Sequence, residues 1–413
     1  MKKLNVLFIN HSVRDGGPGR SLFYILKYID RQKINPYVLI PKDDIFSSLL
    51  KSENLYENIV IENRFPENVL RPRLNSVFNN SFINNSYLLS RLSKIVSILL
   101  NVFDLIIFVF TSGRLLKRNN IKVIYCNGTL AKIVGVLIGR VNDTSVIWHV
   151  RNIQQNSIMK YLMNLISGLR VLKRIICVSG PTANQFYKNK NKLVVISNGI
   201  DLDDYNPDNT AGKLRIEFSI PKTDIVVGTV GRIVPRKKYE NLVYSAKYIR
   251  DNTGDEFKRI KFAVVGDTPY FFRKNHLEEI KATVKKENLN DSFIFTGYTK
   301  DVREYLKDFN IFVITSDYPD PFPRSVIEAM SFSLPVVGFR IGGISESVSN
   351  GITGILSDPD DLRGMSKTIL ELIKDKEKRV SMGKKGRERI KELYQAKDIA
   401  SRIQEQIQLA STS

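Results

Sequence analysis

Two carboxylates, Asp320 and Glu328, lie eight positions apart and enclose a turn that contains two prolines. An apolar run at 311–314 precedes them, and residues 326–330 have the pattern of a helix start. In open α/β sheets, ligands bind at the carboxyl ends of strands, where helix N-termini direct backbone N–H groups outward. A nucleotide-sugar fits such a place, because the helix end binds phosphate and the carboxylates bind sugar and ribose hydroxyls. The alternative is a surface loop with two chance acids.

A second stretch whose residue types could take part in catalysis follows the apolar run at 225–230. Arg232 comes just after this run, and Lys237 follows five positions later. Fixed cations at a strand end would stabilise the charge that develops on a departing diphosphate, in place of a metal ion. Basic loops are common on protein surfaces, so this stretch alone is a weak signal.

The residues after Glu328 make the pattern specific. An apolar strand pattern at 335–339 leads to Gly342 and Gly343, and an acid and an Asn-Gly turn come next. This succession closely resembles glycosyltransferase family 4, the retaining GT-B enzymes related to sucrose and glycogen synthases. The family has a Glu-x7-Glu motif before the same strand and glycine turn. Asp320 stands in place of its first Glu, so the first carboxylate is one methylene shorter here.

The resemblance implies roles for residues of the second half. Arg232 and Lys237 match the family's cations at the donor diphosphate, although Lys238 stands where a glycine is usual. Glu328 would accept ribose hydroxyls, and Gly342 and Gly343 would lie on the nucleotide side of the donor site. The expected donor-binding residues are Gly16, Gly17, Arg232, Lys237, Glu328, Gly342 and Gly343, and the expected catalytic residues are His149, Arg232, Lys237 and Asp320.

Two sites of the first half also match the family. Gly16 and Gly17 belong to a loop that resembles the family's Gly-Gly loop, which lies over the donor phosphates and the reacting centre. His149 follows the strand-like run 145–148, and the family has a histidine at that strand end, facing the transferred sugar. A lone histidine after a strand is more often structural than catalytic, so this role rests on the resemblance.

The pair Asp201 and Asp203 has the Asp-x-Asp spacing of metal-dependent glycosyltransferases. It falls, however, in a stretch that passes from the apolar strand pattern at 193–196 into Asn, Gly, Asp and Pro, the residues of turns. This stretch resembles the family's interdomain connection, so a turn is favoured over a metal site. We expect no metal and no cofactor, because the nucleoside diphosphate sugar is itself the substrate.

Short, β-branched apolar runs recur along both halves of the chain, as in parallel strands buried by helices on both faces. With 413 residues and 43% apolar content, the chain can form two cores. We predict an α/β fold of GT-B architecture, with two doubly wound, Rossmann-like domains. Residues 1–200 would form the acceptor-side domain and 201–388 the nucleotide-sugar domain, and helix 389–413 would return to the first domain. The runs are 5–9, 36–40, 123–126, 145–148 and 174–178, then 225–230, 261–265, 293–296, 311–314 and 335–337.

The net charge of +21 is concentrated in the first half of the chain. Residues 1–200 hold 28 Lys and Arg against 10 Asp and Glu, whereas residues 201–413 hold 35 against 32. A basic half suggests an anionic partner, and the absence of nucleic-acid-binding motifs favours a membrane surface or a lipid-linked phosphate. The two cysteines have no metal-site spacing, and the N-terminus reads as a first strand, so we expect a cytoplasmic protein on the inner membrane face.

Residues 88–110 predict a helix with a narrow polar stripe and a wide apolar face. Lys94 and Asp104 on the stripe argue against a membrane-spanning helix. Two interpretations stay open. The segment is either a long core helix of the first domain or an interfacial helix that docks on anionic lipid. Basic residues near it are Arg71, Arg73, Arg91, Arg114, Lys117 and Arg118.

These features together predict a metal-independent, retaining glycosyltransferase. It would transfer a sugar from a nucleoside diphosphate donor to a hydroxyl of a lipid-linked bacterial surface glycan, such as O-antigen or capsule. One alternative is a catalytically impaired nucleotide-sugar-binding or scaffold protein of the same fold, which the substitution at Asp320 would favour. A GT-B phosphorylase would need a much longer chain.

Overall fold

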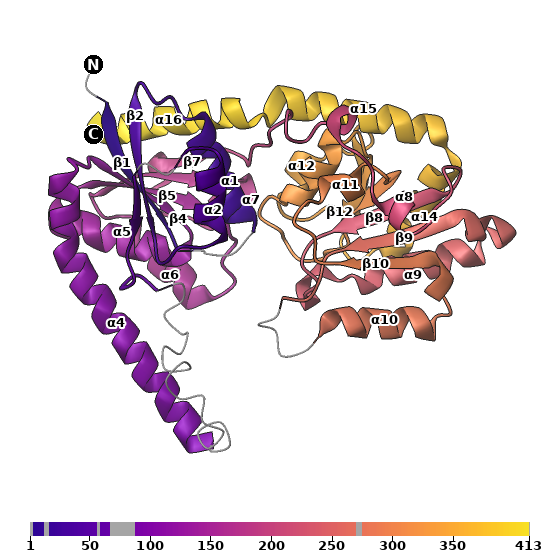
Figure 1. The fold of residues 1–413 in the computed structure, drawn as a ribbon, viewed down its shortest axis with the longest axis horizontal. Helices are drawn as coiled ribbons and strands as arrows, with labels where there is room; N and C mark the ends of the chain where they lie inside the picture. The colour runs from indigo at the N-terminus through magenta and orange to yellow at the C-terminus, as the bar shows by residue number, and fades with distance from the viewer. Residues whose placement is uncertain (1–2, 12–15, 56–57, 67–86, 270–274, 413) are drawn as a thin grey trace. The chain divides into compact units, whose positions relative to one another are not determined.

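The structure, a computed structural model, describes residues 3–11, 16–55, 58–66, 87–269 and 275–412 (Figure 1). The chain forms two compact units, which we call the first and second units. The first contains Met1–Gly199 and Ala396–Ser413, and the second contains Ile200–Gln395. The expected boundary at 388/389 lies inside helix α15 (Lys376–Leu393), so it is displaced from the observed division by seven residues. The chain returns to the first unit with its last helix, α16 (Ala396–Thr412).

The first unit is built on a seven-stranded sheet with the order β3-β2-β1-β4-β5-β6-β7. Every strand pairing in it is parallel. The central strands are buried almost throughout, because helices cover both faces. The strands are β1 (Leu4–Asn10), β2 (Ile34–Ile40), β3 (Ile59–Ile61), β4 (Val123–Asn127), β5 (Ser145–Val150), β6 (Leu172–Cys177) and β7 (Leu193–Val195).

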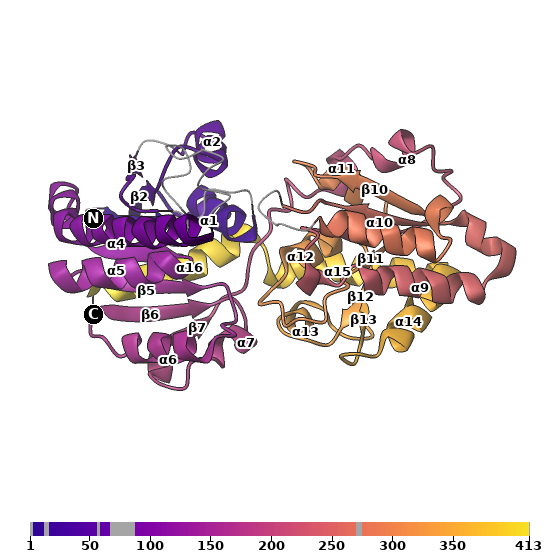
Figure 2. The same cartoon turned by 90° about the horizontal axis from the view of Figure 1, so that it is seen from below.

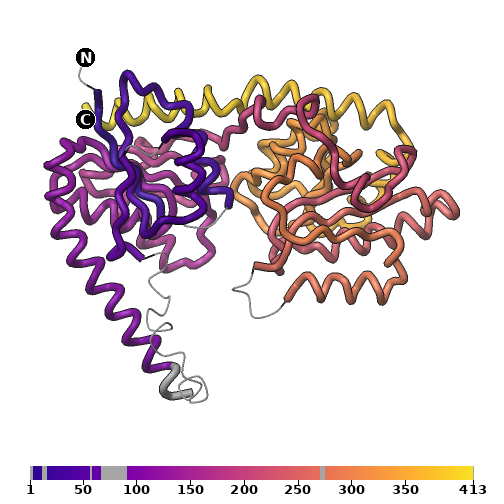
Figure 3. The backbone as a smooth tube through the Cα atoms, viewed as in Figure 1, coloured from indigo at the N-terminus to yellow at the C-terminus, as the bar shows by residue number. Residues whose placement is uncertain are grey.

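Helices α1 and α16 pack against each other, and α16 also contacts β4, β5 and β6. The long helix α4 packs against α5, and in Figure 2 α4, α5 and α6 lie together on the side of the sheet that faces the viewer. The tube in Figure 3 shows that one end of α4 extends well beyond the strands of this unit. The helices are α1 (Gly17–Tyr28), α2 (Ile45–Ser52), α4 (Tyr87–Arg118), α5 (Thr129–Asn142), α6 (Ser157–Ile166) and α7 (Gly180–Ala183).

The second unit has a six-stranded parallel sheet with the order β10-β9-β8-β11-β12-β13. Its core joins the strands to α9, α10 and α14. The strands are β8 (Ile225–Val230), β9 (Ile260–Val265), β10 (Phe293–Gly297), β11 (Ile311–Val313), β12 (Val336–Phe339) and β13 (Gly354–Ser357). The helices are α8 (Leu214–Glu217), α9 (Glu240–Asp251), α10 (His276–Lys286), α11 (Arg303–Leu306), α12 (Arg324–Ser331), α13 (Ile344–Ser347), α14 (Leu362–Lys374) and α15.

The prediction of two doubly wound α/β domains is confirmed, and each of the ten predicted runs contains a strand. The sequence missed two edge strands, β3 and β13. β3 is only three residues long, and β13 was read as part of a turn because glycines surround it. The predicted helix at 88–110 is confirmed and extends to Arg118, whereas Arg71 and Arg73 lie outside the described residues.

Candidate functional site

The first predicted carboxylate and a predicted cation form an ion pair in the second unit. Lys237 Nζ lies 2.6 Å from Asp320 Oδ2, and both side chains are about four-fifths buried. Lys237 ends a short 3₁₀ helix (Pro235–Lys237) after β8, and Asp320 lies in the loop after β11. Because β8 and β11 are neighbours in the sheet, residues 83 positions apart meet at one carboxyl edge. The shorter side chain of Asp320 therefore still contacts the cation.

Backbone contacts hold these two loops together. The Thr315 hydroxyl donates to the carbonyl oxygen of Lys237 at 2.6 Å, and Ser316 Oγ donates to the carbonyl oxygen of Arg236 at 3.0 Å. Both hydroxyls come directly after the apolar residues of β11, so the end of one strand orients the loop of its neighbour. The ion pair is thus held by rigid elements, as a preorganised site requires.

Gly342 and Gly343 allow the turn after β12 to pack closely against the loop that carries Asp320. A Cβ atom on Gly342 would lie 2.5 Å from the carbonyl oxygen of Asp320, and Gly342 has a φ of +55°. A Cβ atom on Gly343 would lie 1.9 Å from the carbonyl oxygen of Pro321, and the Gly343 N–H donates to the Asp320 carbonyl at 2.8 Å. The turn after β12 therefore needs two glycines to approach the Asp320 loop. A contact with the donor stays a prediction.

Lys238, at the position where the family has glycine, adopts a left-handed conformation with a φ of +48°. This conformation explains the usual glycine, because a Cβ atom there costs about 1 kcal/mol. Arg232 lies two residues beyond β8 and is exposed. The backbone N–H of Ile233, the next residue, donates to the Asp267 carbonyl in the loop after β9, at 2.9 Å. The loop that carries both predicted cations is therefore fixed on two sides.

The second carboxylate, Glu328, lies one turn inside α12, because this helix begins at Arg324 and not at Val326 as predicted. Its carboxylate accepts from Arg324 Nε and from the Tyr205 hydroxyl, each at 3.3 Å. Glu328 and Arg324 are both buried. Removal of water strengthens this ion pair and holds the carboxylate in one orientation. The i,i+4 spacing of the pair was visible in the sequence, but it was not singled out there.

Asp201 has a local structural role. Its Oδ1 accepts from the Asp203 N–H at 3.0 Å and from the Asp204 N–H at 3.4 Å, which is the geometry of an Asx turn. Among the described residues, no three His, Cys, Asp or Glu side chains group closely enough to hold a metal ion. These contacts agree with the turn interpretation of Asp201 and Asp203.

In the first unit, His149 lies at the carboxyl end of β5 and is buried. Its Nδ1 contacts the Tyr125 hydroxyl and, at 3.2 Å, Arg151 Nη2. Arginine can only donate, so Nδ1 accepts and the neutral ring carries its proton on Nε2. Burial, with Arg151 and Lys132 nearby, lowers the pKa of His149 well below its usual value. Nε2 is buried and has no protein partner among the described residues, so its N–H is available to a bound molecule.

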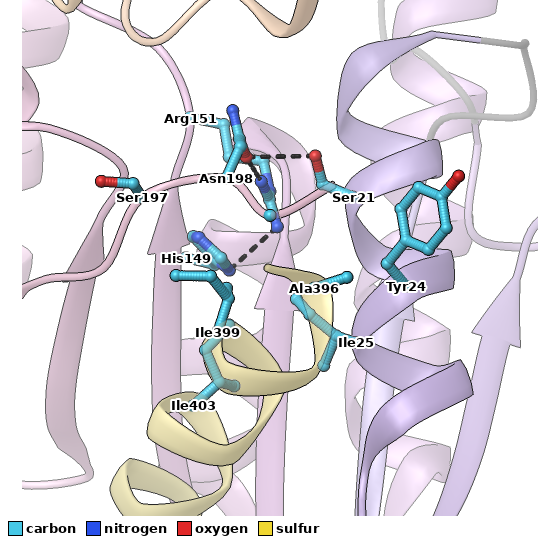
Figure 4. Close-up of a pocket in the computed structure, with 11 residues that line it drawn as sticks. Ser21, Tyr24, Ile25, His149, Arg151, Ser197, Asn198, Ala396, Ile399 and Ile403 are labelled. Atoms are coloured by element: carbon cyan, nitrogen blue, oxygen red, sulfur yellow. Dashed lines mark hydrogen bonds between the residues drawn. The ribbon is translucent and has the colours of Figure 1, made fainter. Parts of the chain in front are cut away.

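His149 lines a small pocket within the first unit (Figure 4). Arg151, which the sequence analysis did not select, connects three neighbours there. Its Nε donates to Asn127 Oδ1 at 2.8 Å, its Nη1 to Asn198 Oδ1, and its Nη2 to His149 Nδ1. Ser21 Oγ also donates to Asn198 Oδ1, at 3.1 Å. The remaining wall is apolar and contains Ile25, Ile399 and Ile403. The pocket therefore has one polar side, which carries a guanidinium and an imidazole.

The predicted glycine loop borders the same edge of the sheet. Gly16 is the N-cap of α1, and a Cβ atom added to it would meet nothing within 4 Å. Any residue can adopt its φ of −178°, so the backbone conformation does not require glycine here. The space beside the Gly16 backbone is open. Asn127 Nδ2 donates to the Pro18 carbonyl at 3.2 Å, which fixes the first turn of α1, where Gly17 lies.

Two further titratable side chains are buried near this edge. Lys132 of α5 is 1% exposed, and burial lowers its pKa to about 8. Its Nζ lies 3.4 Å from Asn152 Oδ1. His11 follows β1, its ring lies against Gly128, and burial lowers its pKa to about 4. The sequence does not indicate that these two residues lie near the same edge, because His11 follows β1 and Lys132 belongs to α5.

Comparisons with known proteins bear on this architecture. Residues 211–389 match the family model described as Glycosyl transferases group 1. N-acetyl-alpha-D-glucosaminyl L-malate synthase of Bacillus anthracis is 26% identical over 193 residues, 46% of this chain and 47% of that protein. An Escherichia coli galactosyltransferase that uses UDP-Gal and a GlcNAc-diphosphoundecaprenol is 23% identical over 64% of this chain and 69% of its own length. The chain thus spans about half of the first relative.

The fold has a counterpart among solved structures. Anabaena Alr3699/HepE, crystallised with UDP and glucose, has a TM-score of 0.77 and 20% sequence identity, and the alignment covers 98% of this chain and 100% of that one. At this identity the likeness concerns the fold. The chain therefore has the GT-B fold, and its residues 211–389 match the model of the glycosyl transferases group 1 family.

Proposed function

We propose that this protein is a retaining glycosyltransferase that needs no metal ion. It transfers a hexose-type sugar from a nucleoside diphosphate sugar to a hydroxyl of a lipid-linked bacterial surface glycan. The second unit binds the donor and the first unit binds the acceptor.

The observation that carries the proposal is the carboxyl edge of the second unit. Lys237 and Asp320 form a 2.6 Å ion pair there, on a sheet whose residues match a glycosyltransferase family. A diphosphate needs a fixed cation, and a sugar needs a fixed acceptor for its hydroxyls. This edge supplies both groups at adjacent positions, and backbone hydrogen bonds orient them.

Each side chain then has a defined task. Arg232 and Lys237 stabilise the negative charge that develops on the leaving diphosphate. Asp320 orients the sugar by accepting hydrogen bonds from its hydroxyls, and Glu328 accepts from the ribose. Arg324 and Tyr205 hold Glu328 in one orientation, since both donate to its Oε1. The Nε2–H of His149 donates to an oxygen of the bound substrate.

In the transfer, the bond between the anomeric carbon and the diphosphate oxygen breaks, and the acceptor oxygen bonds to the same face of that carbon. The acceptor proton passes to the leaving diphosphate, so atoms and charge balance without a further reactant. The two cations take the role that a metal ion has in other transferases, and this role supports turnover without a metal.

Two relatives support the substrate class. The E. coli relative uses a UDP-sugar and a lipid diphosphate acceptor by its name, and the Anabaena protein was crystallised with UDP and glucose. The basic first half of this chain, with a charge balance of +18 over residues 1–200, suits an acceptor that carries a diphosphate.

The test is to incubate the protein with UDP-, GDP- and ADP-sugars and lipid-linked glycan acceptors and to follow free nucleotide and the stereochemistry of the product. We expect release from one donor class, unchanged by EDTA, and retention at the anomeric carbon. Activity that disappears in EDTA and returns with Mn²⁺ would overturn metal independence and favour Asp201 and Asp203 as ligands. The impaired-protein alternative predicts nucleotide binding without release from any donor.

A further inference from the structure

Helix α4 exposes many of its large apolar side chains and buries some of its small polar ones. Ser97 is 0% and Asn101 1% exposed, whereas Leu99 is 63%, Phe103 59% and Phe110 69% exposed. This is the reverse of the pattern of a helix in a water-soluble domain, in which the apolar stripe faces the core. The exposed large apolar residues of the helix are Leu92, Ile95, Val96, Leu99, Leu100, Val102, Phe103, Ile106 and Phe110, and we call them the α4 outer face.

The C-terminal half of α4 is fixed to the first unit. Phe108, Val109 and Leu116 belong to the core of this unit, and Phe108 packs on Phe65 with ring centroids 6.3 Å apart. Arg64 Nη1 donates to Thr111 Oγ1 at 3.0 Å. By length and composition alone, 91–118 is long and apolar enough to cross a membrane. Crossing would remove these residues from the core, so the anchored half holds the helix at the surface of the unit.

Basic residues flank the α4 outer face. Arg91 and Lys94 lie at its N-terminal end, and Arg114, Lys117 and Arg118 follow its C-terminal end, all exposed. Asp104 is the single acid of the helix, and it is only partly exposed. An apolar stripe between basic side chains is the composition of helices that lie in the plane of a membrane interface, where cations meet anionic headgroups.

Two further helices lie on the same side of the sheet as α4 (Figure 2). α5 exposes Leu137 and Val141, and α6 exposes Ile158 and Tyr161. Large exposed apolar areas mark interaction sites on soluble domains. The sequence left open whether this segment is a core or an interfacial helix. The structure packs Phe108, Val109 and Leu116 into the core and leaves the α4 outer face exposed.

We propose that the α4 outer face docks the first unit onto an anionic lipid bilayer, with the helix lying in the headgroup region. The occupant is a bilayer and not a second copy of the chain. Two copies joined through this face would bring two sets of basic flanks together, and each copy already has the +18 balance of residues 1–200. Docking deepens the proposed function, because a lipid-linked acceptor holds its diphosphate at the bilayer surface.

The test is flotation of the full chain with phosphatidylglycerol–phosphatidylcholine vesicles, without donor or acceptor. We expect flotation at low salt, a decrease of about tenfold in the partition coefficient in high salt, and little flotation with pure phosphatidylcholine. A triple variant with Leu99→Ser, Phe103→Ser and Phe110→Ser should lose binding by more than about tenfold at either salt concentration.

A control variant removes three exposed apolar side chains from the second unit, with Ile216→Ser, Ile352→Ser and Val380→Ser. This variant should float like the parent. Since both triple variants change only exposed residues, thermal unfolding near that of the parent checks that the fold is kept.

A second pair of variants tests the charge. Arg114→Gln with Lys117→Gln should weaken binding to the anionic vesicles at low salt by about tenfold or more and reduce the salt dependence. The exposed pair Lys222→Gln with Lys285→Gln is the control and should change neither.

Three results would overturn the proposal. They are no flotation at low salt, equal flotation of the α4 triple variant and the parent, or a dimer in solution that this variant abolishes while vesicles stay unbound. Nucleotide release with a soluble acceptor, measured on the same preparations, distinguishes failure of docking from failure of the proposed function.

Discussion

Cationic side chains lie near the carboxyl edges of both sheets, but the groups that they contact differ. In the second unit, Lys237 pairs with Asp320 and Arg324 pairs with Glu328. In the first unit, Arg151 donates to the amide oxygens of Asn127 and Asn198. An amide oxygen accepts a hydrogen bond but carries no net charge, so these two contacts do not cancel the charge of the guanidinium. The second edge offers carboxylates, which accept hydroxyl groups.

The charge composition of the sequence agrees with this difference. Residues 144–200 contain no Asp and no Glu, although they contribute three strands and two α-helices to the first unit. Under the proposed function, the second edge would bind sugar and ribose hydroxyls and the first edge an anionic group. Three substitutions test this difference and are ordered from the largest expected effect, and a fourth tests the acid stability of the first unit.

Lys237→Ala should lower turnover by about a hundredfold or more, because it removes the fixed charge beside the leaving diphosphate and leaves Asp320 without its cation. Turnover at saturating donor is the measurement. Lys238→Gly is the matched control, since it removes a neighbouring cation and suits the left-handed backbone there. It should keep turnover within about twofold. Equal losses in the two variants would show that the net charge of the loop, and not Lys237, matters.

Glu328→Ala should weaken nucleotide binding by about 1–3 kcal/mol, because a buried acceptor for the ribose is lost. Calorimetry with the nucleoside diphosphate measures this. Glu328→Gln keeps an acceptor for the Tyr205 hydroxyl and tests whether charge is needed. If nucleotide affinity is unchanged in the Ala variant while its stability falls, Glu328 serves only as the partner of Arg324.

Arg151→Met should lower turnover by about tenfold and leave nucleotide affinity within about twofold, since it removes positive charge from the first edge only. Arg151→Lys should recover part of the loss, because it restores the charge without the three-way hydrogen bonding. The measurements are the turnover number and the nucleotide dissociation constant. A comparable loss of nucleotide affinity would remove the distinction between the two edges.

His11→Gln should reduce the acid sensitivity of folding. The pKa of His11 is lowered to about 4 in the folded protein, so between its usual value of 6.5 and 4 the unfolded chain binds a proton that the folded chain does not. Stability is therefore lost as pH falls through this window, by about 3 kcal/mol for this group. Chemical denaturation of parent and variant from pH 7 to pH 4 measures the difference. Parallel curves would contradict it.

Local sequence patterns, mainly the short apolar runs, predicted most of the fold. The ten apolar runs became strands because both faces of each sheet are covered, and such strands need nothing but consecutive apolar residues. Short edge strands have no such run, and β3 was missed for this reason. The boundary expected at 388/389 also lies seven residues before the observed one, because a helical pattern continues from Lys376 to Thr412 and the break at Tyr394 has no proline or glycine to mark it.

The roles expected for His149, Arg232, Lys237, Asp320 and Glu328 stay predictions, but their surroundings are now defined. The spacing of Asp320 and Glu328 is a local property, and the sequence alone identified it. Some of the partners come from distant segments. Asn198 lies 47 positions from Arg151, and Tyr205 lies 123 positions from Glu328, so only the tertiary fold brings these pairs together.

Composition and short-range periodicity encode the two parallel α/β sheets, the carboxylate and cation motifs of the second half, and the unequal charge of the two halves, so these could be predicted from the chain alone. The direction in which α4 faces depends instead on its packing against distant residues. A helical pattern shows that one side is apolar and another polar, but not which side is buried. Packing of Phe108 and Leu116 into the core fixes the rotation of the helix, so Ser97 and Asn101 turn inward and Leu99 and Phe103 face outward.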